Sequence, residues 1–468
     1  MSRTVAESLK ATGLKQVLSY VDKDVDRNAV KIADWLIAHD KDKYAVGSPA
    51  QTAKDAISDK EGNWYRLLKS VYADIDDGVR KKLFENFVIN ASMIGSPRQK
   101  RNALKHSCNI PWAILMDPTT DCNLNCAGCW ASEYGRGNSL SFDQLDDIIR
   151  QGKALGTFFY IYSGGEPLVR SEDILRLCEK HADCVFLAFT NGTLIDERFA
   201  DGMLRVKNFA PAISIEGFRE ATDARRGEGT YDKVIEAMRL LKRKRLPFGI
   251  SLCYTSQNVD VIGSDAYIDH MISLGAKFAW FFTYMPVGRD ALPQLMVSAD
   301  QREHMYRKVR GWRNTKPIFT LDFWNDGEYA GGCIAGGRSY LHINASGDIE
   351  PCAFIHYSDS NIRQHSLLEA CRRPLFMQYY DNQPFCGNML RPCPLLDNPQ
   401  CLTRMVESSG AKSTESANPE DVRELSGKCM QAAECWARAA DRLYAQNGQF
   451  TSRVRRRGKP VKEKEAVV

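Results

Sequence analysis

Short apolar segments alternate with amphipathic segments in the central part of the chain. The apolar segments have the length and composition of β-strands, and apolar residues at three- and four-residue spacing between some of them predict helices. The predicted strands are 112–116, 158–162, 185–189, 210–215, 248–254 and 278–284, and helices are predicted at 142–155, 172–181 and 231–242. Regular alternation of strand and helix predicts a parallel sheet, and six such units favour a barrel or partial barrel.

The segments on either side follow other patterns. Residues 1–105 have helical periodicity at 26–39 and 64–87, interrupted at Ser48–Pro49. After about residue 290 the alternation fades and cysteines become frequent, and the polar segment 407–421 is typical of a surface loop or a disordered insertion. We therefore expect an N-terminal helical region (1–105), the strand–helix unit (106–290), a Cys-rich region (291–450) and a disordered basic tail (451–468).

Composition narrows the class of protein. The 468 residues are 44% hydrophobic and 26% charged, as in ordinary globular proteins, and that length favours two or three domains. No segment approaches the roughly 18 apolar residues of a membrane span, and the first residues have no apolar core of a signal peptide. We therefore expect a cytoplasmic protein without a transmembrane segment. In a reducing compartment its fifteen cysteines are better explained as metal ligands or catalytic thiols than as disulfides.

The net charge of +5 is concentrated at the C-terminus. From Arg453 onward there are seven basic and two acidic residues, which account for the whole excess. A basic tail can bind nucleic acid or anionic lipid, but short charged ends are most often simply solvated. Because the rest of the chain is neutral, nucleic-acid binding is not expected.

Three cysteines directly after the first predicted strand carry the strongest chemical signal. Cys122, Cys126 and Cys129 lie in the run TTDCNLNCAGCW. Three thiolates on one loop can hold three irons of a [4Fe–4S] cluster and leave the fourth iron free to bind a small molecule. Structural zinc sites instead supply four protein ligands. Three ordinary buried thiols within eight mostly polar positions are a poor alternative. The spacing therefore predicts a cluster with an open iron.

Glycine and polar residues follow the next three strands. They form Ser163-Gly164-Gly165-Glu166-Pro167, then Thr190-Asn191-Gly192, then Glu216-Gly217. In barrel enzymes the loops at the C-terminal ends of the strands build the active site. Glycine lets backbone approach a ligand closely, and Thr190 and Asn191 suit a ribose or an adenine edge, although Asn-Gly is also a common turn.

The order of these motifs resembles the radical S-adenosylmethionine (SAM) enzymes over residues 112–290. The resemblance implies a partial (β/α)6 TIM-type barrel in an α/β protein. It also implies a [4Fe–4S] cluster whose open iron binds the amino and carboxylate groups of SAM. One electron then cleaves SAM to methionine and a 5′-deoxyadenosyl radical, which abstracts hydrogen from a substrate. The SAM-binding positions it implies are Gly164, Gly165, Glu166, Pro167, Thr190, Asn191, Ser214, Arg226 and Trp130.

The resemblance assigns a role to two of these residues, and the chain departs from the family pattern at two positions. Ser214 and Arg226 correspond to residues that hold the SAM carboxylate, a task suited to a planar guanidinium, and neighbouring Arg225 is an alternative. The family usually has Asp where this chain has Glu216. It also commonly has an aromatic residue just before the third cysteine, where this chain has Gly128, so Trp130 is expected to take over that contact with adenine.

The C-terminal cysteines resemble a second type of cluster domain. Cys333-x13-Gly347-x4-Cys352 is similar to the opening of SPASM and twitch domains, which bind auxiliary [4Fe–4S] clusters, and its centre predicts a β-hairpin. The spacing of the later cysteines departs from that pattern, so one auxiliary cluster is expected and two are possible by count. Cys371 is unassigned. The candidate ligands are Cys333, Cys352, Cys386, Cys393, Cys401, Cys429 and Cys435, and the cysteines expected at structural core or strand positions are Cys108, Cys178, Cys184 and Cys253.

The sequence contains few signals for the substrate. Tyr284 and Asp322 are candidates, by position, for a proton acceptor or a radical-quenching group at the barrel mouth. The resemblance favours a peptide or protein substrate and a flavodoxin or ferredoxin as electron donor, with a lipid or other small molecule as the alternative substrate. A non-catalytic iron–sulfur electron carrier and a zinc-stabilised binding module are the alternatives from other classes. Neither has a use for the SAM-binding motifs.

Overall fold

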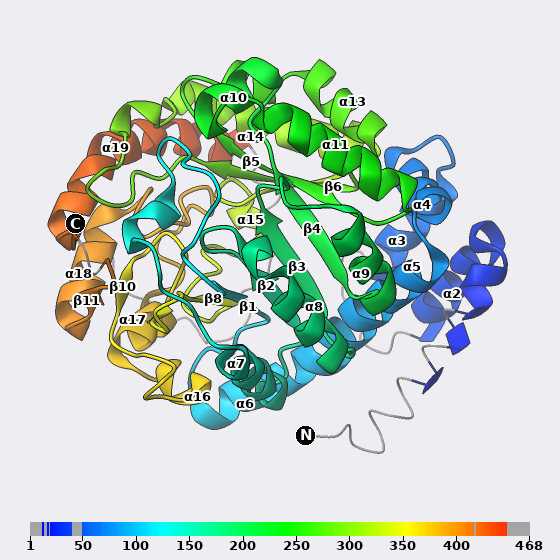
Figure 1. Ribbon diagram of the computed structural model, residues 1–468, viewed down its shortest axis with the longest axis horizontal. Helices are drawn as coiled ribbons and strands as arrows, with labels where there is room; N and C mark the ends of the chain where they lie inside the picture. Colours follow the sequence, from blue (N-terminus) through cyan, green and yellow to red (C-terminus); the bar gives the residue numbers. More distant parts are fainter. Residues whose placement is uncertain (1–11, 14–15, 18, 40–48, 416–417, 447–468) are drawn as a thin grey trace.

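The computed structural model describes residues 12–446, apart from 14–15, 18, 40–48 and 416–417, so the predicted basic tail lies outside the described residues. A nine-stranded sheet is surrounded by helices (Figure 1). Its strands are β1 (Ala113–Met116), β2 (Phe159–Tyr162), β3 (Val185–Thr190), β4 (Phe209–Ser214), β5 (Gly249–Tyr254), β6 (Phe278–Thr283), β7 (Phe319–Asp322), β8 (Tyr340–Ile343) and β9 (Ile349–Glu350).

The connecting helices between β1 and β7 cover the outside of the sheet in Figure 1. They are α7 (Phe142–Leu155), α8 (Ser171–Lys180), α9 (Glu197–Val206), α10 (Arg219–Arg226), α11 (Thr230–Arg243), α12 (Val259–Ile262), α13 (Asp265–Leu274) and α14 (Ala299–Thr315), with short 3-10 turns η2 (Trp130–Tyr134), η3 (Pro167–Arg170) and η4 (Pro293–Leu295). Helix α7 starts at a capping box between Ser141 and Gln144 and ends at Gly156, whose φ is +108°. These local signals explain why the predicted bounds of α7 are confirmed.

The order of the strands is β7-β6-β5-β4-β3-β2-β1-β8-β9. All neighbouring pairs from β7 to β8 are parallel, and β9 pairs antiparallel with β8. The α/β class and the six predicted strands are confirmed. The sheet also gains β7, a strand that the pattern did not predict, and β8, whose parallel pairing with β1 the pattern did not predict.

The sheet is strongly curved, which gives it the character of a barrel. Phe189 of β3 contacts Trp280 and Phe282 of β6 at ring-centroid distances of 5.2 and 5.5 Å, although β4 and β5 lie between them. Phe323, directly after β7, lies 5.8 Å from Tyr340 of β8, so the two ends of the parallel sheet approach each other. The opposite faces of the strands pack on helices, as Phe281 does on Trp312 of α14. The interior is therefore filled by side chains, as expected for a barrel core.

The described N-terminal residues are helical, as predicted. The helices are α2 (Val25–His39), α3 (Pro49–Ser58), α4 (Asn63–Asp74), α5 (Asp77–Phe84), a π-helix η1 (Glu85–Gly95) and α6 (Ser96–His106). The predicted stretch 64–87 is broken because Asp76 caps α5 by accepting from Gly78 N and Val79 N. Asn86 of η1 donates to the carbonyls of Ala182 and Cys184, next to the start of β3. The N-terminal helical region is therefore hydrogen-bonded to the N-terminal end of the barrel.

The Cys-rich region joins the barrel through its own hairpin. The predicted hairpin is present as β8 and β9, and β8 pairs with β1, the strand that precedes the cluster loop. The other elements are β10 (Tyr357–Ser358), β11 (Lys412–Ser413), α15 (Gly327–Ala330), α16 (Leu367–Ala370), α17 (Pro374–Asn382), α18 (Pro399–Ser409) and α19 (Val422–Gln446).

The prediction of a surface loop or a disordered insertion at 407–421 holds in part, because more than half of its described residues are exposed and most have no helix or strand. Helix α18 extends to Ser409, β11 pairs with β10, and Glu415 and Glu420 are buried. A buried carboxylate needs hydrogen-bond partners, and Glu415 Oε1 has one in His356 Nδ1, 2.7 Å away.

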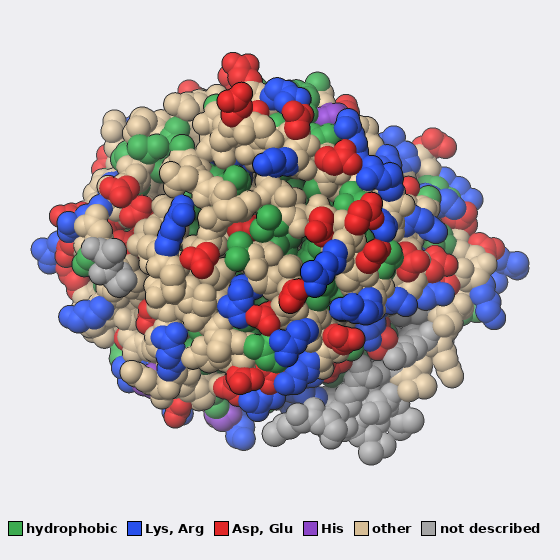
Figure 2. All heavy atoms as spheres, viewed as in Figure 1, with side chains coloured by type: hydrophobic (Ala, Val, Ile, Leu, Met, Phe, Trp, Pro, Cys, Tyr) green, Lys and Arg blue, Asp and Glu red, His purple; other side chains and the backbone are tan. Residues whose placement is uncertain are grey.

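Among the described residues, no helix is both long enough and apolar enough to cross a bilayer. On the face shown in Figure 2, acidic and basic side chains are interspersed over the helices.

Candidate active site

The three cysteines of the predicted cluster loop lie between β1 and η2 and are all partly exposed. The N–H of Leu124 donates to Cys122 Sγ at 3.4 Å, and Arg226 Nη1 lies 3.9 Å from Cys126 Sγ. Burial raises the pKa of the Cys122 and Cys126 thiols, and the charge of Arg226 opposes that shift at Cys126. The donor set fits an iron–sulfur cluster, since it offers accessible thiols with an N–H and a cation nearby to stabilise thiolates.

The glycine turn after β2 lies directly against this loop. Gly165 N donates to Thr119 O at 3.0 Å, and Glu166 N donates to Asp121 O at 2.8 Å. A Cβ atom on Gly164, whose φ is +101°, would lie 2.5 Å from the Thr119 carbonyl oxygen. Glycine is required here because two backbone segments meet without room for side chains.

Glu166 holds the loops after β2 and β3 together. Its buried carboxylate accepts from Thr190 Oγ1 at 2.6 Å, from Asn191 N at 2.7 Å and from Leu168 N at 2.9 Å. Burial raises the pKa of Glu166, although these hydrogen bonds oppose the shift. Asn191 in turn donates to Asn123 Oδ1, within the cluster loop, at 2.8 Å. The side chains of the SGGEP and TNG motifs therefore hold the cluster loop in place.

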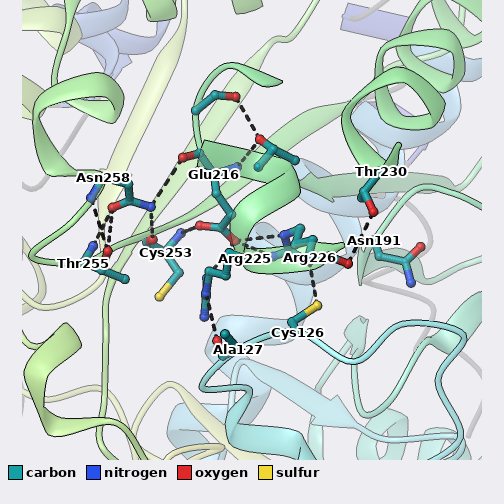
Figure 3. A network of polar contacts seen from close by, with 12 residues as sticks. Cys126, Ala127, Asn191, Glu216, Arg225, Arg226, Thr230, Cys253, Thr255 and Asn258 are labelled. Carbon is teal, nitrogen blue, oxygen red and sulfur yellow. Dashed lines mark hydrogen bonds and ion pairs between the residues drawn. The ribbon is translucent and has the colours of Figure 1, made fainter. Parts of the chain in front are cut away.

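Glu216 is the centre of a buried ion-pair network at the C-terminal end of β4 (Figure 3). Arg225 and Arg226, in the last turn of α10, contact Glu216 Oε1 at 2.7 and 2.5 Å. The N–H of Cys253 donates to Glu216 Oε2 at 3.2 Å. Arg225 also meets the cluster loop, because Ala127 N donates to its carbonyl oxygen at 2.9 Å. The network thus brings two guanidinium groups beside Cys126.

The remaining predicted SAM-binding residues are Ser214, Pro167 and Trp130. Ser214 is partly exposed at the end of β4 and is in register with Ser251 of β5, and Pro167 is buried at the start of η3. Trp130 packs against Phe354, His342 and His356 at 5.6 to 6.0 Å, which places its indole against the C-terminal region.

The space beside Gly128 is filled by another aromatic ring. A Cβ atom on Gly128 would lie 2.8 Å from Tyr284 Cε2, and the Tyr284 hydroxyl accepts from Leu292 N at 2.9 Å. The departure at position 128 is therefore matched by a ring that comes from the end of β6.

Comparison with known proteins decides the family. The profile of the Radical SAM superfamily matches residues 116–262, which include the cluster loop, the glycine turn and the Glu216 network. Mycofactocin maturase MftC of Mycolicibacterium smegmatis is 30% identical over 299 residues, 57% of this chain and 74% of MftC. The chain belongs to the radical SAM superfamily.

Other similar proteins differ in their described activities. The AdoMet-dependent heme synthase of Methanosarcina barkeri is 25% identical over 291 residues, 56% of this chain and 82% of that protein. The structure of SuiB of Streptococcus suis bound to S-adenosylmethionine superposes with a TM-score of 0.54, covering 72% of this chain and 81% of SuiB at 18% identity. SuiB supports the radical SAM fold, and the family implies a [4Fe–4S] cluster and SAM as cofactors.

Three of the candidate auxiliary ligands of this radical SAM protein line one cavity. Cys333, Cys352 and Cys393 share a cavity of about 160 Å³ with aromatic residues of the barrel, including Trp280 and Trp324. Burial raises the pKa of each of the three thiols to about 12. Tyr340 donates its hydroxyl to Cys352 Sγ at 2.7 Å. Burial and the charge of Cys393 raise the pKa of Cys429 in α19, so Cys429 lies near Cys393.

The other candidate ligands lie elsewhere. Cys401 interacts with Cys386 and accepts from Arg404 at 3.2 Å, and Cys435 accepts from Arg438 at 3.7 Å. Among the described residues, no three Cys, His, Asp or Glu side chains converge as the ligands of a single metal ion do.

Asp322 lies deep in the protein at the end of β7, on the wall of the auxiliary cavity. It accepts from Asn325 Nδ2 at 2.8 Å and from the Tyr254 hydroxyl at 3.3 Å. Burial, together with the charge of Asp326, raises its pKa to about 6. Asp322 is therefore near the auxiliary thiols, whereas Tyr284 is near the cluster loop.

Several residues of the site have no motif in the sequence. Cys253, expected at a core or strand position, lies in β5 and is partly exposed beside Arg225, and Asn258 donates to its carbonyl oxygen at 3.2 Å. The expectation of core positions is confirmed for Cys108, Cys178 and Cys184, which are fully buried, and the unassigned Cys371 is buried near Cys108.

Proposed function

We propose that this radical SAM enzyme binds its catalytic [4Fe–4S] cluster through Cys122, Cys126 and Cys129. When bound, the cluster and SAM would supply a 5′-deoxyadenosyl radical that abstracts a hydrogen atom from an organic substrate. The observation that carries this proposal is the contact between Cys126 and Arg226, within a network that also fixes the cluster loop through Arg225. It places two cations where the carboxylate of a ligand on the cluster needs a partner.

The other residues of the site have positioning roles in this proposal. The backbone of Gly164 and Gly165 would form the close edge of the SAM site, and Ser214 offers a hydroxyl at the C-terminal end of β4, two residues before Glu216. Glu166, Thr190 and Asn191 hold that edge against the cluster loop through their mutual hydrogen bonds. Tyr284, whose ring contacts Gly128, is better placed than Trp130 to lie beside a ligand of this loop.

We also propose an auxiliary [4Fe–4S] cluster in the cavity lined by Cys333, Cys352 and Cys393, with Cys429 as the fourth ligand. The support is that Cys333, Cys352 and Cys393 come from three separate segments and still line one cavity, and that Cys429 lies near enough to Cys393 for the Cys393 charge to raise its pKa. The hydroxyl of Tyr340 would stabilise the Cys352 thiolate through its hydrogen bond. Asp322 on the same wall would serve as a proton acceptor during substrate oxidation.

Peptide modification is the substrate class that we favour, because two of the similar proteins are a maturase and SuiB, one structure of which contains its precursor peptide SuiA. A small molecule is the second candidate. It is supported by the similarity to a heme synthase and by the aromatic wall of the auxiliary cavity, which includes Trp280, Phe323 and Phe354. A flavodoxin or ferredoxin would supply the electron in either case.

Product release tests the proposal directly. Anaerobically reconstituted protein, dithionite and SAM should yield 5′-deoxyadenosine. Cys126→Ala should abolish the product while iron bound in the C-terminal region stays in place. Cys178→Ala, at a fully buried position on α8, is the matched control and should retain the product. Iron-loaded wild-type protein that releases no 5′-deoxyadenosine would refute the proposed function.

A further inference from the structure

A chain of buried polar side chains connects both ends of the cluster loop to the C-terminal hairpin. Asp117 lies five residues before Cys122, and Tyr134 lies five residues after Cys129. Between them in space are His342 of β8 and Glu350 of β9. Asp117, His342 and Glu350 have no exposed surface, and Tyr134 is 3% exposed.

The contacts within the chain are short and continuous. His342 Nε2 lies 2.9 Å from Asp117 Oδ2, and His342 Nδ1 lies 2.6 Å from Glu350 Oε2. The Tyr134 hydroxyl donates to that same Glu350 oxygen at 2.7 Å. A single imidazole therefore joins the segment before the cysteines to the segment after them.

Glu350 is held in place from its other side as well. Its Oε1 accepts from Thr414 Oγ1 at 2.6 Å and from Asn344 Nδ2 at 3.0 Å. Since both nitrogens of His342 lie near carboxylate oxygens, the protonated imidazole would form an ion pair with Asp117 and another with Glu350. Burial alone would lower the pKa of His342, but the charges and hydrogen bonds of Asp117 and Glu350 raise it to about 10. The two carboxylates therefore favour the charged form of His342.

The chain also reaches the glycine turn. A Cβ atom on Gly164 would lie 2.9 Å from Asp117 Cβ, so Asp117 lies directly beneath the turn. Trp130, one residue after Cys129, has its ring centroid 5.9 Å from that of His342. None of these side chains contacts a cysteine sulfur in the described contacts. Their influence on the cluster must therefore act through the position of the loop.

We propose that Asp117, His342, Glu350 and Tyr134 form a positioning network through which the C-terminal hairpin fixes both ends of the cluster loop. This inference rests on the proposed function of that loop. The arrangement makes the geometry of the SAM site depend on β8 and β9, which lie more than 200 residues after the cysteines in sequence. The C-terminal region then contributes to SAM binding without supplying a ligand to the catalytic cluster.

Two variants test the network, each with a matched control. His342→Gln removes the cation, and Tyr134→Phe removes one hydroxyl without changing the ring. His181→Gln is the control for the first, because His181 makes a similar buried contact with Asp146, 2.9 Å away, on the helical side of the barrel. Tyr160→Phe is the control for the second, because its buried hydroxyl donates to Ile149 O at 2.9 Å, away from the loop.

The first readout does not need activity. Alkylation of Cys122, Cys126 and Cys129 in the apoprotein, followed by mass spectrometry, measures how often the loop opens. A lost hydrogen bond to a charged group should increase that rate about tenfold in both network variants. The controls should match the wild type. Equal rates in all five proteins would overturn the inference.

The second readout uses the reconstituted enzyme. Both network variants should raise the KM for SAM and change the EPR spectrum of the reduced cluster in the presence of SAM, with the C-terminal iron content unchanged. A network variant with wild-type KM and spectrum would overturn the inference. If the wild type itself forms no 5′-deoxyadenosine, the proposed function fails, and the alkylation rates still decide whether the network positions the loop.

Discussion

Substitution of Gly164 by alanine is a sharp test of how the glycine turn meets the cluster loop. The φ of +101° at this residue costs an L-residue about 1–2 kcal/mol. The added Cβ would also lie 2.5 Å from the Thr119 carbonyl oxygen and 2.9 Å from Asp117 Cβ. Both neighbours belong to the segment that leads into Cys122, so relief of the overlap has to displace that segment. Overpacking of this kind costs about 1–3 kcal/mol.

Gly137 provides the control, because it has a similar φ of +87° and open space around its Cβ position. Gly137→Ala should cost only the backbone strain of about 1–2 kcal/mol. Urea unfolding of the apoproteins should therefore show Gly164→Ala to be less stable than Gly137→Ala by about 1–3 kcal/mol. Gly164→Ala alone should also raise the KM for SAM. Equal stabilities and equal KM values for the two variants would refute the reasoning about this turn.

Three further predictions concern buried charges and thiols. Glu216→Gln should lower the free energy of unfolding by about 3–5 kcal/mol and raise the KM for SAM, because two arginines lose a buried partner. Asp232→Asn, which breaks the exposed pair with Arg219, is the control and should change stability little. Urea unfolding and SAM kinetics of both variants measure these effects. The pKa of His342 is raised from 6.5 to about 10, so the stability added by its charged form is complete below pH 6.5 and is lost as the pH rises through about 10. The difference in unfolding free energy between wild type and His342→Gln should therefore shrink over that pH range. Cys393→Ala should lower the iron content of reconstituted protein by up to one cluster, and an unchanged iron content would contradict the auxiliary site.

The strands that the sequence predicted share a strong local signal. The predicted segments at 158–162 and 278–284 are apolar because one face packs on helices and the other on the barrel interior. Strand β7 was missed because it is short and only two of its four residues are buried, so its apolar signal is weak. The pairing of β8 with β1 joins residues that are far apart in sequence, and no local pattern encodes such a contact.

The same distinction applies to the site. The cluster cysteines and the glycine turn were predictable because each motif is contiguous and follows directly on a strand. The partners of Glu216 and the position of His342 between Asp117 and Glu350 were not, since they come from segments that meet only in the folded protein. Trp130 shows that adjacency in sequence can also suggest the wrong contact. Its position next to Cys129 suggested a contact with adenine, but its ring lies against Phe354 and His356 of the C-terminal region.

The central claim is that three protein thiolates leave one iron of the catalytic cluster open to SAM. An EPR spectrum of the dithionite-reduced protein, recorded before and after addition of SAM, tests this most directly. We predict that SAM changes the signal of the cluster held by Cys122, Cys126 and Cys129, and that the change disappears in Cys126→Ala. A wild-type cluster signal from that loop that SAM leaves unaltered would contradict the account.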